Sequence, residues 1–301
     1  MSDRGYSLVE MLISMAIMLT VFGGVCQLAS PAHATALIQA ELQDMEQRAR
    51  IVADRLTRDL WLAGAGPIGV PRGGPLGARF TPILPIICCG GGADAPGSAF
   101  TDRVTIMYAP ADAIQAVTAT DISPGALLLS LAPGPSCLSP PLCGFADGDL
   151  LLVFDDSGSF DTFRIDLSSG LPMLLPRSSP YSATYTAGAT AVRVISRTYF
   201  HDAISDRLFV SENEAAPQPI VDGVTAFRLQ YRDSSGASLD VQLGDGPWRG
   251  GGGTVYDADL LRVRSVRVSF TIRSGLSGTG ALSIPDLTSA IDVTLRNGGS
   301  G

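Results

Sequence analysis

The sequence predicts an α+β fold in which one long N-terminal helix packs on an antiparallel β-sheet ectodomain with long loops. The first observation behind this prediction is an apolar, almost uncharged run over residues 7–28. The second is a following segment whose apolar residues recur at steps of three and four, and the third is a set of short alternating apolar and polar runs after residue 100. These patterns are typical of a membrane-length helix, an amphipathic helix and strands with one buried face.

A short polar leader, residues 1–5, precedes the apolar run and ends in Gly5. The run is long enough to span a bilayer whose hydrocarbon layer is ~30 Å thick. Glu10 is the only charged residue within it. Because a carboxylate in lipid costs roughly 2.5–3.5 kcal/mol on insertion scales, we expect Glu10 to have a partner.

The leader ending in Gly5, the aromatic Tyr6 and a glutamate at the fifth position after the glycine together resemble the type IV prepilin signature. The resemblance implies that a prepilin peptidase cuts between Gly5 and Tyr6, and that the new amino group of Tyr6 is N-methylated. It also implies that residues 6–32 form a transmembrane helix that becomes part of a filament core. The usual residue after the cut is phenylalanine, so Tyr6 departs from the pattern while keeping an aromatic ring.

Cleavage would place an ammonium group on Tyr6, about one helical turn from Glu10. Pairing of a carboxylate with an ammonium offsets part of the cost of placing each charge in a low dielectric. The resemblance implies that this pairing runs between neighbouring subunits, which makes Glu10 the assembly carboxylate. The simpler alternative is that Glu10 extends to the lipid headgroups.

Other interpretations of the N-terminus fit less well. An ordinary secretory signal has an apolar stretch of about 7–15 residues, shorter than this one, although Arg4 and residues 32–34 would supply its two ends. A lipoprotein site at Cys26 is disfavoured by the bulky Val25 before it. A plain transmembrane anchor stays an alternative because the length fits. Arg4 favours a cytoplasmic leader, so we expect a single-pass inner-membrane protein with a periplasmic ectodomain.

Residues 33–63 are predicted to continue the helix as an amphipathic segment. Its predicted apolar face consists of Ile38, Leu42, Met45, Ala49, Val52, Leu56 and Leu60. Acidic residues precede basic ones by four in the pairs 44–48, 46–50 and 54–58, an order that stabilises an exposed helical face. Pro31 lacks a backbone donor and is expected to kink the helix near the membrane surface. Gly64 and Pro67 are expected to end it.

Residues 64–190 are predicted to form a variable, loop-rich β region, and residues 191–296 a C-terminal antiparallel β region. The stretch 64–99 is rich in Gly and Pro and shows no clear periodicity. The predicted strands are 103–109, 126–131, 149–154, 160–166, 191–200, 206–210, 227–232, 266–273 and 291–296. The tail, residues 297–301, is expected to be disordered.

Three C-terminal stretches, residues 219–231, 263–274 and 293–297, are similar to those of minor pilins of the PilW type. The J-type pseudopilin of type II secretion shares the strand start Asp222-Gly223-Val224 and is the near alternative. The resemblance implies a low-copy subunit near the filament tip that helps to start type IV pilus assembly. The implied partners are the prepilin peptidase, other pilins or pseudopilins, and the inner membrane.

The cysteines fit an exported protein. Four lie beyond the apolar segment, where an oxidising compartment favours disulfides: Cys88, Cys89, Cys137 and Cys143. Four cysteines allow three connectivities. A local Cys137–Cys143 bridge is the first hypothesis, and a bridge from Cys88 or Cys89 to the later loop is the alternative. Cys26 is expected to be a packing residue.

Composition and motifs favour a structural function over an enzymatic one. The net charge is −8, with no lysine and no basic cluster, which disfavours nucleic acid as a partner. There is no nucleophile elbow, phosphate loop or zinc-protease helix, and His33 and His201 are expected to be surface or loop residues. We expect no catalytic residue, cofactor or metal, and the carboxylate-rich segments 147–149 and 155–159 are interpreted as hairpin turns rather than calcium loops. The alternative from another class is a surface adhesin or binding module that uses residues 64–190.

Overall fold

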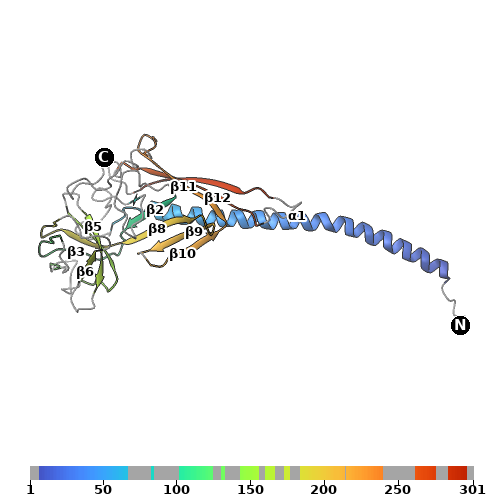
Figure 1. The fold of residues 1–301 in the computed structure, drawn as a ribbon, viewed down its shortest axis with the longest axis horizontal. Helices are drawn as coiled ribbons and strands as arrows, with labels where there is room; N and C mark the ends of the chain where they lie inside the picture. The colour runs from blue at the N-terminus through green and yellow to red at the C-terminus, as the bar shows by residue number, and fades with distance from the viewer. Residues whose placement is uncertain are drawn as a thin grey trace.

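The computed structural model describes residues 7–66, 83–84, 102–124, 130–132, 143–155, 160–166, 173–176, 184–213, 215–239, 262–275 and 284–296, with the side chains of residues 28–32, 84, 160 and 173–176 excluded. One N-terminal helix is followed by antiparallel sheets (Figure 1). The structure therefore confirms the predicted α+β, pilin-like fold class.

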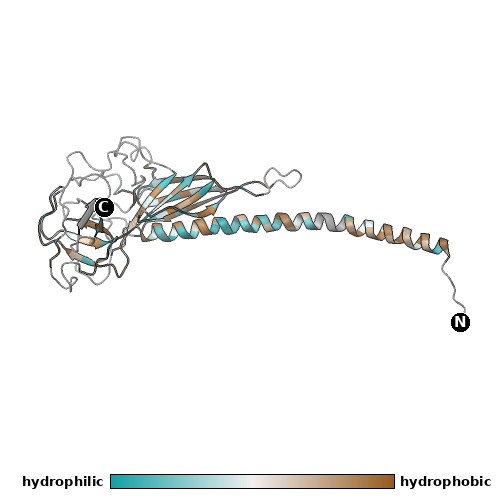
Figure 2. Ribbon diagram, turned by 60° about the horizontal axis from the view of Figure 1, so that its bottom comes forward, coloured by the Kyte–Doolittle hydropathy of each residue, from teal (hydrophilic) through white to brown (hydrophobic). Residues whose placement is uncertain are grey.

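The helix α1 (Leu8–Leu62) has 55 residues and therefore a length of about 80 Å at 1.5 Å per residue. Its C-terminal half lies against the sheets, whereas its N-terminal half projects away from them (Figure 1). Brown, apolar residues dominate the projecting half and alternate with teal, polar ones in the attached half (Figure 2). The helix continues through Pro31, where the sequence predicts a kink, and it curves along its length.

The helix ends where the glycine signal predicts. Ala63 is the C-cap, and its N–H donates to the Leu60 carbonyl oxygen. Gly64 follows with a φ of 71°, a left-handed conformation that glycine adopts without steric cost. The Gly64 N–H then donates to the carbonyl oxygen of Met107, so the chain turns directly from the helix onto a strand.

Two sheets pack around the attached half of α1. The first has the order β1 (Ile83–Leu84), β2 (Arg103–Tyr108), β8 (Ile195–Asp202), β9 (Arg207–Glu212) and β10 (Gln218–Asp222). The second has the order β11 (Val224–Arg232), β12 (Ser265–Ile272) and β13 (Leu287–Thr294). Every neighbouring pair is antiparallel, and both sheets share one apolar core with the helix. We call α1 from residue 38 onward and these two sheets the helix-bound body.

The core of the helix-bound body follows the predicted periodicities. The helix contributes Met45, Ala49, Val52, Leu56, Leu60 and Ala63. The alternating side chains of β11 and β12 are buried in turn, as expected for strands with one wet face. Leu42 departs from the prediction: it is 42 % exposed, although Ile38 before it packs against the core and Met45 after it is buried.

A third sheet lies beyond the C-terminal end of α1, at the opposite end of the molecule from the N-terminus (Figure 1). Its order is β3 (Gln115–Val117), β7 (Thr190–Arg193), β4 (Leu150–Phe154), β5 (Phe160–Asp166) and β6 (Met173–Pro176). We call it the distal sheet. Every residue of β4 is buried, and separate apolar clusters lie around alternate residues of β4, as expected when both faces are covered.

The distal sheet is an insertion between two paired strands. β2 and β8 are antiparallel neighbours in the helix-bound body, yet the chain between them forms all five distal strands. The single residue Val194 separates β7 from β8, so the chain passes from one sheet to the other without a turn. An insertion of this kind enlarges the protein at one end and leaves the sheet around the helix intact.

This connection explains where the predicted strands differ from the observed ones. The predicted strand 191–200 is two strands in two sheets, because its apolar pattern continues across Val194. The predicted boundary between residues 190 and 191 falls inside β7. Strands near 103–109, 149–154, 160–166, 206–210, 227–232 and 266–273 are confirmed, the last one begins at Leu287, and most of 126–131 lies outside the described residues.

Candidate functional site

The predicted assembly residue Glu10 lies in the first turn of α1. Ser7 caps the helix, its side-chain oxygen accepting a hydrogen bond of 3.4 Å from the Val9 N–H. A carboxylate in the first turn is stabilised by the partial positive charge of the helix N-terminus. Among the described residues, none pairs with the Glu10 side chain. Gly5 and Tyr6, on either side of the predicted cut, lie outside the described residues.

The side chains around Glu10 form an uncovered apolar surface. The segment Leu8–Gln27 is long and apolar enough to cross a membrane, and none of it is buried within the protein. The hydroxyls of Ser14 and Thr20 donate to carbonyl oxygens of their own helix, which removes their polarity from this surface. Glu10 is therefore the one side chain of this segment whose charge is not satisfied within the described residues.

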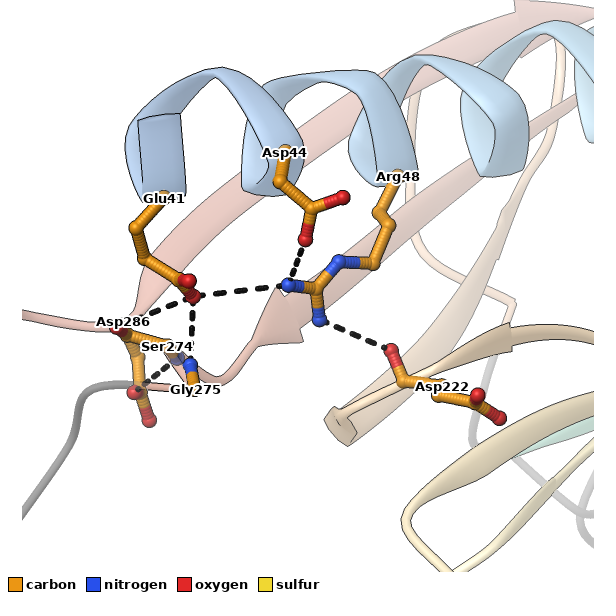
Figure 3. Close-up of polar contacts among 7 residues, drawn as sticks. All are labelled: Glu41, Asp44, Arg48, Asp222, Ser274, Gly275 and Asp286. Atoms are coloured by element: carbon orange, nitrogen blue, oxygen red, sulfur yellow. Dashed lines mark hydrogen bonds and ion pairs between the residues drawn. The ribbon is translucent and has the colours of Figure 1, made fainter. Parts of the chain in front are cut away.

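A polar cluster attaches the middle of α1 to the body (Figure 3). Arg48 forms an ion pair with Asp44, one turn before it, and its Nη2 lies 3.6 Å from Glu41 Oε1. Its Nη1 donates to the carbonyl oxygen of Asp222 at 3.5 Å, at the end of β10. Of the three predicted acid–base pairs, the pair Asp44–Arg48 is the one whose arginine contacts the sheets. It therefore helps to hold the helix in register with them.

Glu41 extends the same cluster to the segment after β12 (Figure 3). Its Oε1 accepts hydrogen bonds of 2.6 Å from the Gly275 N–H and 3.3 Å from the Ser274 hydroxyl. The Ser274 N–H in turn donates to Asp286, just before β13. Bonds from charged groups to backbone N–H groups are among the stronger hydrogen bonds, so Glu41 fixes this loop on the helix.

Gly223 joins the two sheets of the helix-bound body beside Arg48. It is the only residue between β10 and β11, and its φ is 74°. A Cβ at this position would lie 2.9 Å from Arg48 Nη1 and 3.5 Å from the carbonyl oxygen of Arg273. The Asp-Gly-Val strand start is thus a crossover between sheets that only glycine fits without displacement.

The far end of α1 is attached by a buried carboxylate. Asp59 is 0 % exposed, lies 2.7 Å from Arg197 Nη1 and accepts a short hydrogen bond from the Tyr199 hydroxyl. Arg197 also pairs with Glu212 at 2.8 Å. Burial raises the pKa of Tyr199, and the charge of Asp59 raises it further. Burial opposes the charge of Arg197, but the bond to Glu212 and the charge of Asp59 raise its pKa overall.

The buried carboxylate was not predicted, although the sequence carries a signal for it. Asp59 lies between Leu56 and Leu60, so its position in the amphipathic pattern borders the apolar face. An acidic residue there needs a partner when it is buried. The partners on β8 could not be named, because no sequence pattern specifies which arginine and tyrosine reach it.

The distal sheet has its own polar attachments. The Tyr185 hydroxyl donates to the buried Asp161 at 2.6 Å. Arg164 of β5 donates to the carbonyl oxygen of Asn213, and Asn213 Oδ1 accepts a hydrogen bond from the Ser196 N–H. The bonds of Arg164 and Asn213 join the distal sheet to β8 and the end of β9, so the insertion is tied to the body as well as connected to it.

The predicted cysteines and carboxylate-rich turns form no further site within the described residues. Cys143 is disulfide-bonded, and its partner lies outside the described residues, as do Cys88, Cys89 and Cys137. Cys26 is a free thiol on the exposed apolar helix surface. The segment 147–149 is a turn in which Asp149 accepts a hydrogen bond from the Ala146 N–H, and most of 155–159 lies outside the described residues. Within the described residues, no group of three His, Cys, Asp or Glu side chains could hold a metal ion.

A comparison with known protein families matches residues 1–25 to the prokaryotic N-terminal methylation motif. Together with the apolar helix, this match supports a type IV pilin-like protein. The motif implies processing by a prepilin peptidase and assembly with other pilins, and the apolar helix indicates a single-pass membrane anchor. No curated protein matches the chain.

Proposed function

We propose that the chain is a minor pilin that is cut between Gly5 and Tyr6, methylated on Tyr6 and incorporated into a type IV pilus. Its first location is the inner membrane, with the ectodomain in the periplasm. The observation that carries the proposal is the uncovered apolar half of α1, which projects from the body and holds the single carboxylate Glu10 near the new terminus.

The chemistry of this helix favours assembly over simple anchoring. An anchor needs only apolar length, and an unpaired carboxylate opposes its insertion. A subunit that meets other subunits inside a membrane gains from one, because the ammonium of a neighbour's Tyr6 neutralises it. Glu10 is therefore proposed as the group that receives the terminus of the adjacent subunit.

The distal sheet favours a position at the filament tip. It extends the molecule beyond the C-terminal end of α1, at the end opposite the projecting apolar half of the helix (Figure 1). When subunits stack along a filament with their helices aligned, this is the direction in which the next subunit would be met. A subunit enlarged there is accommodated most easily where nothing follows it, so we place it at the tip, where assembly starts.

Mass spectrometry of the protein in purified filaments tests the processing step. The expected terminus is an N-methylated Tyr6. An intact Met1, or a terminus at Thr35, would contradict the proposal. Gold-labelled antibodies against the distal sheet are expected at one end of each filament, and even decoration of the shaft would exclude the tip position.

Two alternatives make different predictions. The Asp222-Gly223-Val224 crossover also fits a J-type pseudopilin, in which case the protein would co-purify with type II secretion components instead of pilus components. A binding module built on residues 64–190 would keep its ligand affinity in a fragment that begins near Ala34. An assembly subunit would lose its function in that fragment.

A further inference from the structure

Exposed sheet edges are templates for further strands, and in the described sheets most edge strands have features that disfavour such pairing. β10 carries Pro219 and β6 ends at Pro176, and proline cannot donate to a ladder. β1 has two residues and β3 has three, too few to pair with a long strand. β11, the other edge of its sheet, has nine residues but carries the basic side chains of Arg228 and Arg232, which also disfavour pairing. β13 differs from these edge strands because it has eight residues, no proline and no basic side chain.

One edge of β13 carries unpaired backbone groups. β13 pairs with β12 over its whole length, from Leu287 to Thr294. The Leu295 N–H donates to the Arg264 carbonyl oxygen. Because the backbone groups of successive residues point to opposite sides of a strand, the residues at odd positions of β13 bond to β12 and those at even positions point away from it. The N–H and C=O groups of Thr288, Ala290, Asp292 and Thr294 therefore point away from β12. Within the described part of the chain, these backbone groups have no hydrogen-bond partner.

This edge runs beside α1. At its start, Asp286 is joined through Ser274 to Glu41 of the helix. At its end, the Arg296 guanidinium lies 4.8 Å from the centre of the Trp61 ring. β13 thus follows the helix from residue 41 to residue 61, and a strand added to its edge would also lie along the helix.

Two apolar side chains of the helix are partly exposed at the two ends of this stretch. Leu42 belongs to the apolar helix face by its spacing, yet it is 42 % exposed. Trp61 is 50 % exposed at the other end. A strand added beside β13 would satisfy the backbone groups, and near Trp61, which Arg296 contacts at the end of the edge, it would also bury apolar surface.

We propose that the outward edge of β13 binds an extended strand of a neighbouring pilin-like subunit, which becomes the fourth strand of the β11–β12–β13 sheet. The proposal rests on the proposed function, which surrounds the apolar half of α1 with the helices of neighbouring subunits. Because β13 follows the same helix, the chain nearest to its edge in such an assembly is the body of a neighbour. Backbone pairing tolerates different sequences, so it suits a subunit that contacts several kinds of pilin.

The test uses the full-length chain in cells that assemble the filament. A photo-crosslinking amino acid at Thr294 reports on the neighbour, and one at Ala226, exposed on the first strand of the same sheet, is the control position. Ala290→Pro removes an outward N–H without removing a bond to β12, whereas Ala290→Val keeps that N–H. Thr288→Pro is a second variant of the first kind, in case one proline disturbs folding.

The expected result is a crosslink from Thr294 to a subunit that carries the prepilin motif. Its yield falls about fivefold or more in Ala290→Pro and Thr288→Pro and is unchanged in Ala290→Val. Thermal melting of the purified variants checks that the body is folded. Unchanged crosslinking in folded proline variants, or crosslinking to a protein without the prepilin motif, would overturn the proposal.

The same experiment separates this inference from the proposed function. If the unaltered protein keeps Met1 or is absent from filaments, the assembly function itself fails. If it is processed and incorporated but Thr294 gives no crosslink to a neighbour, only strand addition to β13 fails.

Discussion

The two halves of α1 each carry a carboxylate in apolar surroundings. One carboxylate has partners within the chain, and the other has none among the described residues. Asp59 is fully buried and bound by Arg197 and Tyr199 of the same chain. Glu10 lies on an apolar surface that the protein leaves uncovered, and none of the described residues pairs with it. A charge that is satisfied internally stabilises a fold, whereas one that is left for another molecule favours assembly.

The two halves of α1 also differ in how much of their surface the rest of the protein contacts. The attached half of α1 shares a core with two sheets and is fixed by the clusters around Arg48 and Asp59. The projecting half has no contact of this kind along Leu8–Gln27. Substitutions in the attached half should therefore change the free energy of unfolding, and substitutions in the projecting half should change incorporation.

The largest loss of stability is expected for Asp59→Ala. The substitution leaves the buried Tyr199 hydroxyl unsatisfied and removes one partner of Arg197, which keeps Glu212. Breaking a buried ion pair typically costs 3–5 kcal/mol, and we expect about 4 kcal/mol here. Urea unfolding of the full-length protein in detergent would measure it. The matched control Asp54→Ala, on the exposed face of the same helix, should stay within about 0.5 kcal/mol, and an equal loss there would contradict the distinction.

Leu56→Ala should have the next largest effect. Leu56 is fully buried between the helix and the sheets, and removing a buried leucine side chain costs about 2–5 kcal/mol. We expect about 3 kcal/mol in the same unfolding measurement. Leu12→Ala removes the same atoms from the projecting half and should leave the unfolding of the body unchanged. A comparable loss for both variants would mean that the two halves of the helix are not independent.

The sequence predicts the elements of this comparison better than their connections. The steps of three and four from Met45 to Leu60 predict the buried helix face, and the alternation in β11 and β12 predicts their wet and buried sides. Both follow from periodicity, which is a local property. That β2 pairs with β8 across the whole distal insertion is a non-local property, and no local pattern specifies it.

The site is predictable to a similar extent. Glu10 could be named because a charge in a membrane-length apolar run contradicts its surroundings. The roles of Arg48 and Gly223 could not be assigned, because they depend on a loop and a helix brought together over 174 positions. The exposure of Leu42 was also missed, since periodicity assigns a face to a residue but not the extent to which that face is covered.

Gly223→Ala should have a smaller effect than either core variant. A left-handed backbone costs a non-glycine residue about 1–2 kcal/mol, and the new Cβ would also push against Arg48 Nη1. Because that atom ends a flexible side chain, we expect the total to stay near 2 kcal/mol. Gly236→Ala is the matched control: its φ is 83° and nothing lies within 4 Å of its Cβ position. Equal losses for the two variants would show that the contact with Arg48 contributes nothing.

Glu10→Ala should have the smallest effect on stability and still impair assembly. Because Glu10 has no partner among the described residues, its removal should change the unfolding of the body by less than about 0.5 kcal/mol. Membrane insertion and cleavage after Gly5 should be unaffected, since the apolar run becomes more apolar. Incorporation should fall, because the neighbour's ammonium on Tyr6 then has no counter-charge in the membrane.

The measurement is the ratio of variant protein in sheared filaments to that in membranes, with Ser14→Ala as the control in the same segment. Normal incorporation of Glu10→Ala would remove the contrast between the two carboxylates, since Glu10 would then be as dispensable for assembly as it is for folding.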